Sequence, residues 1–351
     1  MPKPIRVLIV DDSVLVREAA RQALSGQPGV EVMDTAMDPL YAMEKMAREW
    51  PDVIVLDIQM PRMDGISFLK KIMAERPTPV VICSSLVGNG AQIGVEALRA
   101  GAVSLISKPK AGVSAFFENE SDNLVAAVRA ASHTNLARLR QIATTLRPIP
   151  PLVKPARPGT LSADGRVIAI GSSTGGTQAL ETVLGALGTD LPGMVIVQHM
   201  PLGFSKKFAD RLNQDIRIEL CEAQHGQRVE PGLALLAEAG KQMRLQKSGS
   251  GYIVEVVEGP IINRHRPSVD CLFSSVAKVA GPRALGLIMT GMGDDGALGM
   301  KEMFDCGAHT IAESEETCVV FGMPRVAIAR GGVREVQPLH KIAERVRAWV
   351  G

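Results

Sequence analysis

Short apolar runs alternate with stretches of helical apolar spacing from Ile5 to Lys108. The runs are IRVLIV (5–10), VEVMDTA (30–36), DVIVLD (52–57), PVVICSS (79–85) and VSLISKP (103–109). Aliphatic runs of this length predict β-strands. Their alternation with amphipathic helices predicts a parallel sheet that carries helices on both faces.

One of these helices has a well-marked start. Asp38 is a favoured N-cap residue, and Pro39 suits the first helical position. The apolar residues that share one face of this helix are Leu40, Met43, Ala47 and Trp50. Further along, Gly101 is expected to end another helix.

Polar residues follow the predicted strands at the point where each strand ends. They are Asp11, Asp12, Asp57, Ser84 and Lys108. Ligands of open parallel sheets bind beyond the carboxyl ends of the strands, so these side chains are expected to converge. Three carboxylates repel one another unless they hold a hard cation, and Mg²⁺ would leave coordination positions for a phosphoryl group. Lys108 and the Ser84 hydroxyl could then contact phosphate oxygens. Taken singly, Asp57 could equally be a helix cap and Lys108 a surface charge.

This segment resembles the response-regulator receiver domain along its whole length. The resemblance is carried by the acidic pair in DDS (11–13), by VLDIQMPRMDG (55–65), by the hydroxyl in CSS (83–85) and by the lysine in SKP (107–109). It implies a flavodoxin-like doubly wound domain in which a histidine kinase phosphorylates Asp57. Leu105 departs from the pattern, because receivers often carry a tyrosine or phenylalanine there that reorients on phosphorylation.

A linker is expected after the first domain. No acidic residue occurs between Val125 and Ala163, and five prolines fall between Pro148 and Pro158. Its first part, LVAAVRAASHTNLARLRQIATTL (124–146), has helical spacing and could continue from the receiver, whereas RPIPPLVKPARPGT (147–160) is expected to be extended. A solvated tether is favoured, although a basic linker could also contact an acidic partner. We expect a receiver domain over 1–123, a linker over 124–160 and a second domain over 161–351.

A second α/β pattern begins at Arg166. Its apolar runs are RVIAI (166–170), GMVIVQ (193–198) and ALGLIMT (284–290), and the breaks that follow them hold Ser173, His199 and Asp295. If these strands are parallel neighbours, the three side chains meet at one sheet edge. Residues 227–245 and 251–259 read as antiparallel strands with glycine-containing turns. We therefore expect a doubly wound domain with a mixed sheet.

Ser173 lies in the glycine-rich turn of RVIAIGSSTGGT (166–177), between a strand and a stretch of helical spacing. The spacing satisfies Gly-x-Ser-x-Gly, the nucleophile elbow pattern of serine hydrolases. A turn used only for chain reversal, or one that cradles a phosphate, would look similar. Likewise His199 alone could be a capping or packing residue, and Asp295 alone could bond backbone amides in a plain turn.

Together the three residues supply a nucleophile, a base and a carboxylate that orients the base. Their chain order of serine, histidine and aspartate argues against the α/β-hydrolase fold, whose acidic residue precedes its histidine. The backbone N–H of Thr174, after the serine, is a plausible oxyanion donor.

The second half resembles the catalytic domain of the chemotaxis protein-glutamate methylesterases. The resemblance rests on IGSSTGGT (170–177), VQHMPLGFSKKFADRLN (197–213), NRHRPSVDCLF (263–273), LIMTGMGDDGALGM (287–300) and CVVFGMPRVAI (318–328). It implies that Ser173, His199 and Asp295 are catalytic, that Asp294 occupies a variable position, and that no cofactor serves this domain. Departures are LLAEAGKQM (235–243), where Ala-Pro-Gly is more usual, and Glu313, where glutamine is common.

The resemblance also implies substrates and regulation. The substrates would be glutamate methyl esters on the cytoplasmic helices of chemoreceptors, with glutamine deamidation as a related activity. Phosphorylation of Asp57 would relieve a restraint that the receiver imposes. Arg264, His265 and Arg266 could line the substrate groove, or could equally form a solvated basic loop.

Composition limits the remaining functions. The 39 basic and 37 acidic residues give a net charge of +2, so no global field points to nucleic acid or to a membrane surface. The five cysteines form no CxxC pair and fit reduced packing positions. No apolar run is long enough to span a bilayer, and a cytoplasmic location is expected. The rival functions are a response regulator whose second half only binds, such as a transcription factor, and a general esterase.

Overall fold

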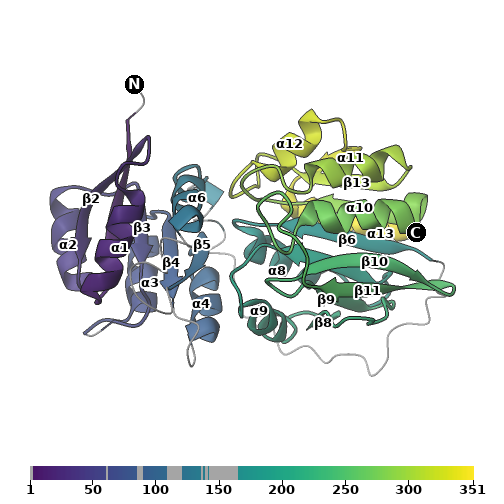
Figure 1. Ribbon diagram of the computed structural model, residues 1–351, viewed down its shortest axis with the longest axis horizontal. Coiled ribbons are helices and arrows are strands. Elements are labelled where there is room, and N and C mark those ends of the chain that lie inside the picture. The colour runs from purple at the N-terminus through teal and green to yellow at the C-terminus, as the bar shows by residue number, and fades with distance from the viewer. Residues whose placement is uncertain are drawn as a thin grey trace. The chain divides into compact units, whose positions relative to one another are not determined.

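The computed structural model describes residues 3–60, 62–84, 90–108, 121–135, 137–138, 141 and 165–351. The chain divides into two compact units, Met1–Arg147 and Pro148–Gly351 (Figure 1). The proline-rich part of the expected linker lies outside the described residues. No helix within the described ranges is both long and apolar enough to cross a membrane.

A parallel sheet forms the centre of the first unit. Its strands are β1 (Ile5–Val10), β2 (Val30–Ala36), β3 (Val53–Leu56), β4 (Val80–Ser84) and β5 (Ser104–Ser107). Their order is β2-β1-β3-β4-β5, and every pairing is parallel. This order is that of flavodoxin-like folds, so the expected architecture is confirmed.

The helices of this unit are α1 (Val14–Leu24), α2 (Pro39–Arg48), α3 (Gly65–Glu75), α4 (Gly90–Arg99) and α6 (Ser121–Ser132). Helix α6 contacts α1 and β5. Residues 124–132 of the expected linker therefore lie in a helix that packs on the first unit. The domain boundaries remain a prediction.

Helix α2 begins as predicted but buries a different face. The Asp38 carboxylate accepts hydrogen bonds from the N–H groups of Leu40 and Tyr41, and Pro39 is the first helical residue. The buried side chains are those of Pro39, Ala42 and Met46, whereas Leu40 is 41% exposed. The predicted apolar face was wrong because the small Ala42, not the larger Leu40, lies against the sheet.

The second unit contains a larger parallel sheet. Its strands are β6 (Val167–Ser172), β7 (Met194–Gln198), β8 (Glu219–Glu222), β9 (Leu233–Leu236), β12 (Ala284–Ile288), β13 (His309–Glu313) and β14 (Glu335–Gln337). They follow the order β14-β13-β12-β6-β7-β9-β8. The three runs expected to be parallel neighbours are therefore adjacent, as β12-β6-β7.

The sheet is not mixed, and this part of the prediction was wrong. All pairings among its seven strands are parallel. The expected hairpin exists as β10 (Gln242–Ser248) and β11 (Gly251–Val257), but it forms a separate antiparallel sheet. The run LALL (233–236), which we read as antiparallel, is strand β9 of the main sheet. A continuous buried apolar run of this kind suits a parallel strand.

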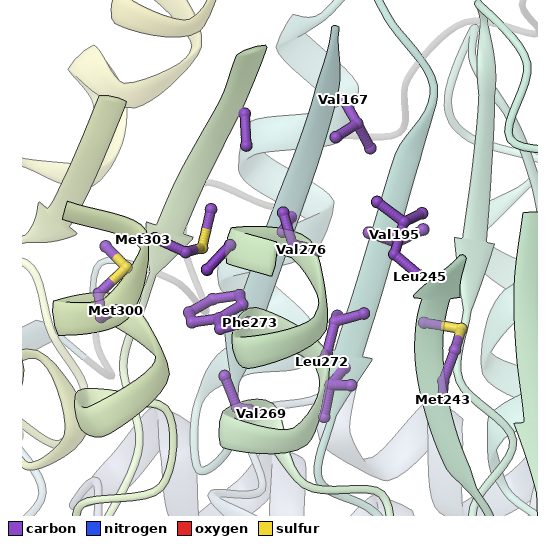
Figure 2. Packing of buried hydrophobic residues seen from close by; sticks show 14 of the residues in the cluster. Val167, Val195, Met243, Leu245, Val269, Leu272, Phe273, Val276, Met300 and Met303 are labelled. Atoms are coloured by element: carbon purple, nitrogen blue, oxygen red, sulfur yellow. The ribbon is translucent and has the colours of Figure 1, made fainter. Parts of the chain in front are cut away.

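Helices and the hairpin cover the large sheet. The helices are α8 (Gly176–Ala186), α9 (Ser205–Leu212), α10 (Val269–Ala280), α11 (Ala297–Asp305), α12 (Met323–Ala329) and α13 (Leu339–Val350), with a short 3₁₀ turn at Gly281–Arg283. Phe273 and Val276 of α10 belong to one buried apolar cluster with Met303 of α11 and the strand residue Val167 (Figure 2). Hairpin residues such as Met243 belong to the same apolar cluster. All six residues of β6 are buried, as expected for a strand covered on both faces.

Candidate functional site

Acidic residues of the first unit form a cluster at the carboxyl edge of its sheet. Asp11 follows β1, and Asp57 follows β3. Asp11, Asp12 and Asp57 each offer a carboxylate oxygen within 4.8 Å of the others. Gly65 sits so close to Asp57 that a Cβ there would lie 2.3 Å from the Asp57 carbonyl oxygen. Because Gly65 has no side chain, α3 can start directly beside this cluster of carboxylates.

Lys108, which follows β5, places a positive charge next to these carboxylates. Its Nζ lies 2.7 Å from Asp11 Oδ2 and 2.7 Å from Asp57 Oδ2. Burial raises the pKa of Asp11 to about 6, although the Lys108 charge opposes the shift. Burial likewise raises the pKa of Asp57. One ammonium thus offsets only part of the cost of burying these carboxylates.

The donor set fits a hard divalent cation. Three carboxylate oxygens within reach of one another are the ligands that Mg²⁺ prefers, and a cation would relieve the repulsion between them. Ser84 ends β4 and is 1% exposed, and its carbonyl accepts a hydrogen bond from the Lys108 N–H. The five predicted residues of this site therefore all lie at one sheet edge.

In the second unit, the segments that carry the predicted catalytic residues follow three adjacent strands and meet at one sheet edge. Ser173 directly follows β6, and His199 directly follows β7. The Ser173 N–H donates to the Thr290 carbonyl at 3.0 Å, and the His199 N–H donates to the Ser172 carbonyl at 3.0 Å. These backbone bonds continue the parallel pairing beyond the strands, so the segments after β6, β7 and β12 meet at one edge.

Glycines shape the turn that carries Ser173. Gly175 caps α8 with a φ of 78°, and a Cβ there would lie 2.4 Å from the Val319 side chain. A Cβ on Gly291 would lie 2.7 Å from the Ser173 Cβ, so Gly291 leaves room for the serine side chain. The glycine-rich pattern thus reflects close packing around a sharp strand-to-helix turn.

Some backbone N–H groups of this turn already donate hydrogen bonds within the protein. The Ser173 N–H already bonds the Thr290 carbonyl and is not available to a substrate oxygen. Thr174 is half-buried, and its carbonyl accepts a hydrogen bond of 2.9 Å from the Thr290 hydroxyl. This bond fixes the peptide between Thr174 and Gly175, next to the N-terminus of α8.

His199 and Asp295 form a direct hydrogen bond. His199 Nε2 lies 2.8 Å from Asp295 Oδ2, and the exposed fractions of the two side chains are 9% and 1%. Asp295 is thus the acid that reaches the imidazole, whereas the neighbouring Asp294 is only half-buried. Because the carboxylate accepts, Nε2 carries a proton, and Nδ1 is left as the basic nitrogen. Nδ1 is buried, and no described residue hydrogen-bonds it.

The N-terminus of α10 stabilises the Asp295 carboxylate. Oδ1 accepts hydrogen bonds from the Ser268 hydroxyl at 2.7 Å and the Asp270 N–H at 3.1 Å, and Oδ2 accepts one from the Val269 N–H at 2.7 Å. Burial alone would raise the pKa of Asp295, but the hydrogen bond to His199, followed by those from Ser268 and Val269, outweighs burial and holds that pKa below its usual value. The carboxylate is therefore charged and fixed.

A second imidazole covers His199. The rings of His199 and His265 stack with centroids 3.7 Å apart and an angle of 12° between their planes. Burial, followed by the charge on His199, lowers the pKa of His265 to about 3. His265 is therefore neutral, and its ring lies flat against the ring of His199. Its neighbours Arg264 and Arg266 are exposed, so the three residues of this basic segment do not share one environment.

Sequence reasoning missed two of these contacts. His265 was considered only as a groove residue, and Ser268 was not considered at all. A signal for Ser268 existed, because serine is a favoured N-cap and the apolar run of α10 follows it. No local signal marks the stacking of His265 on His199, since the two lie in separate parts of the chain.

The fold and these sites define a class of protein with two domains. The first is a doubly wound domain with a cluster of carboxylates bridged by a lysine. The second is an α/β domain with a serine, a histidine and a buried aspartate at one sheet edge. The CheB methylesterase family matches residues 168–346, and the response regulator receiver domain matches residues 7–114. The chain belongs to the CheB methylesterase family and carries an N-terminal receiver domain.

Relatives share this organisation over nearly the whole chain. A protein of Chromobacterium violaceum named protein-glutamate methylesterase/protein-glutamine glutaminase 2 is 54% identical and covers 97% of this chain and 99% of its own length. A protein of the same name in Dechloromonas aromatica is 56% identical, covering 97% of each chain. The crystal structure of the Thermotoga maritima CheB methylesterase catalytic domain is 35% identical, covers 53% of this chain and 100% of that chain, and superposes with a TM-score of 0.52.

Proposed function

We propose that Ser173, His199 and Asp295 are the catalytic triad with which this hydrolase cleaves glutamate methyl esters and glutamine amides of chemoreceptors. The family and the named relatives supply the activity, which is that of a protein-glutamate methylesterase and protein-glutamine glutaminase. The observation that carries the residue assignment is the buried 2.8 Å contact from His199 Nε2 to Asp295, at the sheet edge where Ser173 also stands.

Both reactions are acyl transfers to water. In the first step, His199 Nδ1 takes the Ser173 hydroxyl proton while Oγ attacks the substrate carbonyl carbon. The imidazolium then gives that proton to the leaving group, which departs as methanol or ammonia. In the second step the same nitrogen takes a proton from water, and the hydroxide attacks the carbonyl carbon of the glutamyl-serine ester. The C–Oγ bond breaks, and the imidazolium returns the proton to Oγ, which restores the Ser173 hydroxyl and releases glutamate. Asp295 remains charged and stabilises the imidazolium.

Oxyanion stabilisation is assigned to the backbone N–H of Thr174. This peptide follows the nucleophile and precedes α8, whose N-terminus favours negative charge. The hydrogen bond from the Thr290 hydroxyl to the Thr174 carbonyl supports the assignment, because it restricts rotation of that residue's backbone.

Asp57 is the assigned phosphorylation site of the receiver. Asp11, Asp12 and Asp57 would hold Mg²⁺, which when bound shields the negative charge of an incoming phosphoryl group. Lys108 already bridges Asp11 and Asp57, so its ammonium is placed to contact a phosphoryl oxygen on Asp57. Ser84, at the end of the neighbouring strand, is assigned the second phosphate contact. Phosphorylation activates hydrolysis in the second domain.

These assignments imply two partners. A chemotaxis histidine kinase supplies the phosphoryl group, and methylated chemoreceptors supply the substrate. Because receptor methyl esters lie on cytoplasmic helices, we place the protein in the cytoplasm.

Methanol and ammonia release tests the proposal. Receptor-bearing membranes, methylated or in the glutamine form, are incubated with the full chain, with and without Mg²⁺ and a small phosphodonor. Release of both products, faster with the donor, is expected. Hydrolysis of p-nitrophenyl acetate with no release from receptors would instead identify a general esterase.

A further inference from the structure

The residues that directly precede Ser173 and His199 contact each other beneath the catalytic edge. Ser172 ends β6, Gln198 ends β7, and the two are direct partners in the parallel pairing of these strands. Their exposed fractions are 0% and 3%. Buried polar side chains at such positions need hydrogen-bond partners, and the partners here are the catalytic segments themselves.

Gln198 bonds both catalytic residues through their backbones. Its Nε2 donates to the Ser173 carbonyl at 2.8 Å and to the His199 carbonyl at 2.8 Å. Its Oε1 accepts from the Ser172 hydroxyl at 2.7 Å. Only the NH₂ end of the amide can face two carbonyl oxygens, so the amide orientation is fixed by chemistry.

The surrounding packing leaves this amide little freedom. A Cβ on Gly176 would lie 2.2 Å from Gln198 Oε1 and 2.7 Å from the Ser172 Cβ. The start of α8 therefore closes over the amide. The Ser173 carbonyl also accepts from the Gly176 N–H at 2.8 Å, so the peptide after the nucleophile is held from two sides.

We propose that Gln198 is a positioning residue that fixes the nucleophile relative to its base. Ser173 and His199 follow separate strands, and the NH₂ group of Gln198 joins their carbonyls by two hydrogen bonds. The role rests on the proposed function, since it matters only if these two residues react together. A displacement of about 1 Å between reacting groups can lower the rate on the order of 100-fold.

Two substitutions remove the hydrogen-bond donors of Gln198 but keep a side chain of similar size. Gln198→Glu keeps the shape and the acceptor for Ser172 but removes both donors. Gln198→Met removes all three hydrogen bonds at similar length. For methanol release by the full chain, we expect each variant to lower kcat roughly 100-fold with KM within about twofold of wild type. The second-order rate of Ser173 labelling by a fluorophosphonate should fall in parallel.

Thr310→Val is the matched control for loss of a buried hydrogen bond. Thr310 is 0% exposed, and its hydroxyl accepts from the Arg334 N–H at 3.0 Å near the start of β13, at the opposite end of the strands. It should lower the melting temperature about as much as the Gln198 variants while kcat is retained. Equal melting temperatures and equal kcat values for the Gln198 and Thr310 variants would overturn the positioning role.

The Ser172→Ala variant keeps the inference testable if the Gln198 variants fail to fold. It removes only the donor that orients the amide, so a smaller loss of kcat is expected, and wild-type kcat would contradict the network. If wild type releases no methanol, the proposed function fails. The labelling rate still decides the inference then, because equal labelling of wild type and Ser172→Ala counts against positioning.

Discussion

The two polar sites of this protein both lie at the carboxyl edge of their sheets. The pKa values of their buried carboxylates, however, are shifted in opposite directions. In the receiver, burial raises the pKa of both Asp11 and Asp57, and Lys108 compensates only in part. In the second domain, Asp295 is just as buried, yet hydrogen bonds hold its pKa below the usual value. At the first site the partners of the carboxylates do not outweigh the effect of burial, whereas at the second site they do.

This difference matches the two kinds of work. A site whose partners only partly offset the burial of its carboxylates changes state when a cation or a phosphoryl group arrives, which suits a switch. A site whose carboxylate is held by three hydrogen bonds besides that to the imidazole is ready before substrate binds, which suits catalysis by preorganised groups.

Removing the charge of Asp295 should have the largest effect. Asp295→Asn turns an acceptor toward His199 Nε2 into an amide and favours the wrong imidazole tautomer, so kcat should fall on the order of 10⁴-fold. Asp294→Asn is the control, because that side chain is not the one bonded to His199, and it should retain most activity. Methanol release measures both. A dead Asp294→Asn beside an active Asp295→Asn would reverse the assignment.

Removing Asp57 should abolish the switch. Asp57→Asn takes away the phosphoryl acceptor and one carboxylate of the cluster. The ratio of methanol release rates with and without a phosphodonor should therefore fall to about one. Asp52→Asn, which alters an acid paired with Arg6 elsewhere in the same domain, should keep the wild-type ratio. A full response in Asp57→Asn would place the acceptor elsewhere.

Loss of the Ser268 hydroxyl should weaken the second site without destroying it. Ser268→Ala removes one hydrogen bond to a charged group, worth about 1.5–3 kcal/mol, but leaves the Val269 and Asp270 N–H donors in place. We expect a lower melting temperature of the catalytic domain and roughly a tenfold lower kcat, equivalent to about 1.4 kcal/mol of barrier. Unchanged values would mean that the backbone donors suffice.

The smallest effect concerns pH. His265 has a pKa of about 3 in the native domain against an ordinary 6.5, so below pH 6.5 the unfolded chain binds a proton that the native domain does not. This contribution to stability is therefore complete above pH 6.5 and decreases as the pH falls toward 3, by at most about 1.4 kcal/mol per pH unit. Urea unfolding at pH 7 and pH 5 measures it. His265→Phe keeps a ring against His199 but should reduce the pH dependence, and an unchanged pH dependence would count against a neutral His265.

Much of this arrangement follows from the sequence because strand ends are visible in it. Apolar runs that stop at Asp57, Ser173 and His199 place these residues at a sheet edge, and adjacency of β12, β6 and β7 brings the second set together. The choice of Asp295 over Asp294 came from family resemblance, because spacing alone does not tell which of two adjacent acids turns inward.

Other features depend on contacts that no local pattern encodes. The hairpin β10–β11 reads as antiparallel, but whether it joins the main sheet depends on the helix that packs beside it. The carboxylate of Asp295 gains its donors from Ser268, Val269 and Asp270, which are more than twenty residues away in the chain. The buried face of α2 was missed for a related reason, since the choice between Ala42 and Leu40 is made by the shape of the sheet.

Covalent trapping tests the central claim, that Ser173 is activated by His199 and held by the surrounding network, most directly. Full-length protein is treated with a fluorophosphonate, residual methanol release is measured, and the modified peptide is identified by mass spectrometry. We predict one modification, on Ser173, that rises in step with the loss of activity and is nearly absent in His199→Ala. Modification of another residue in step with inactivation, or wild-type methanol release by Ser173→Ala, would contradict the account.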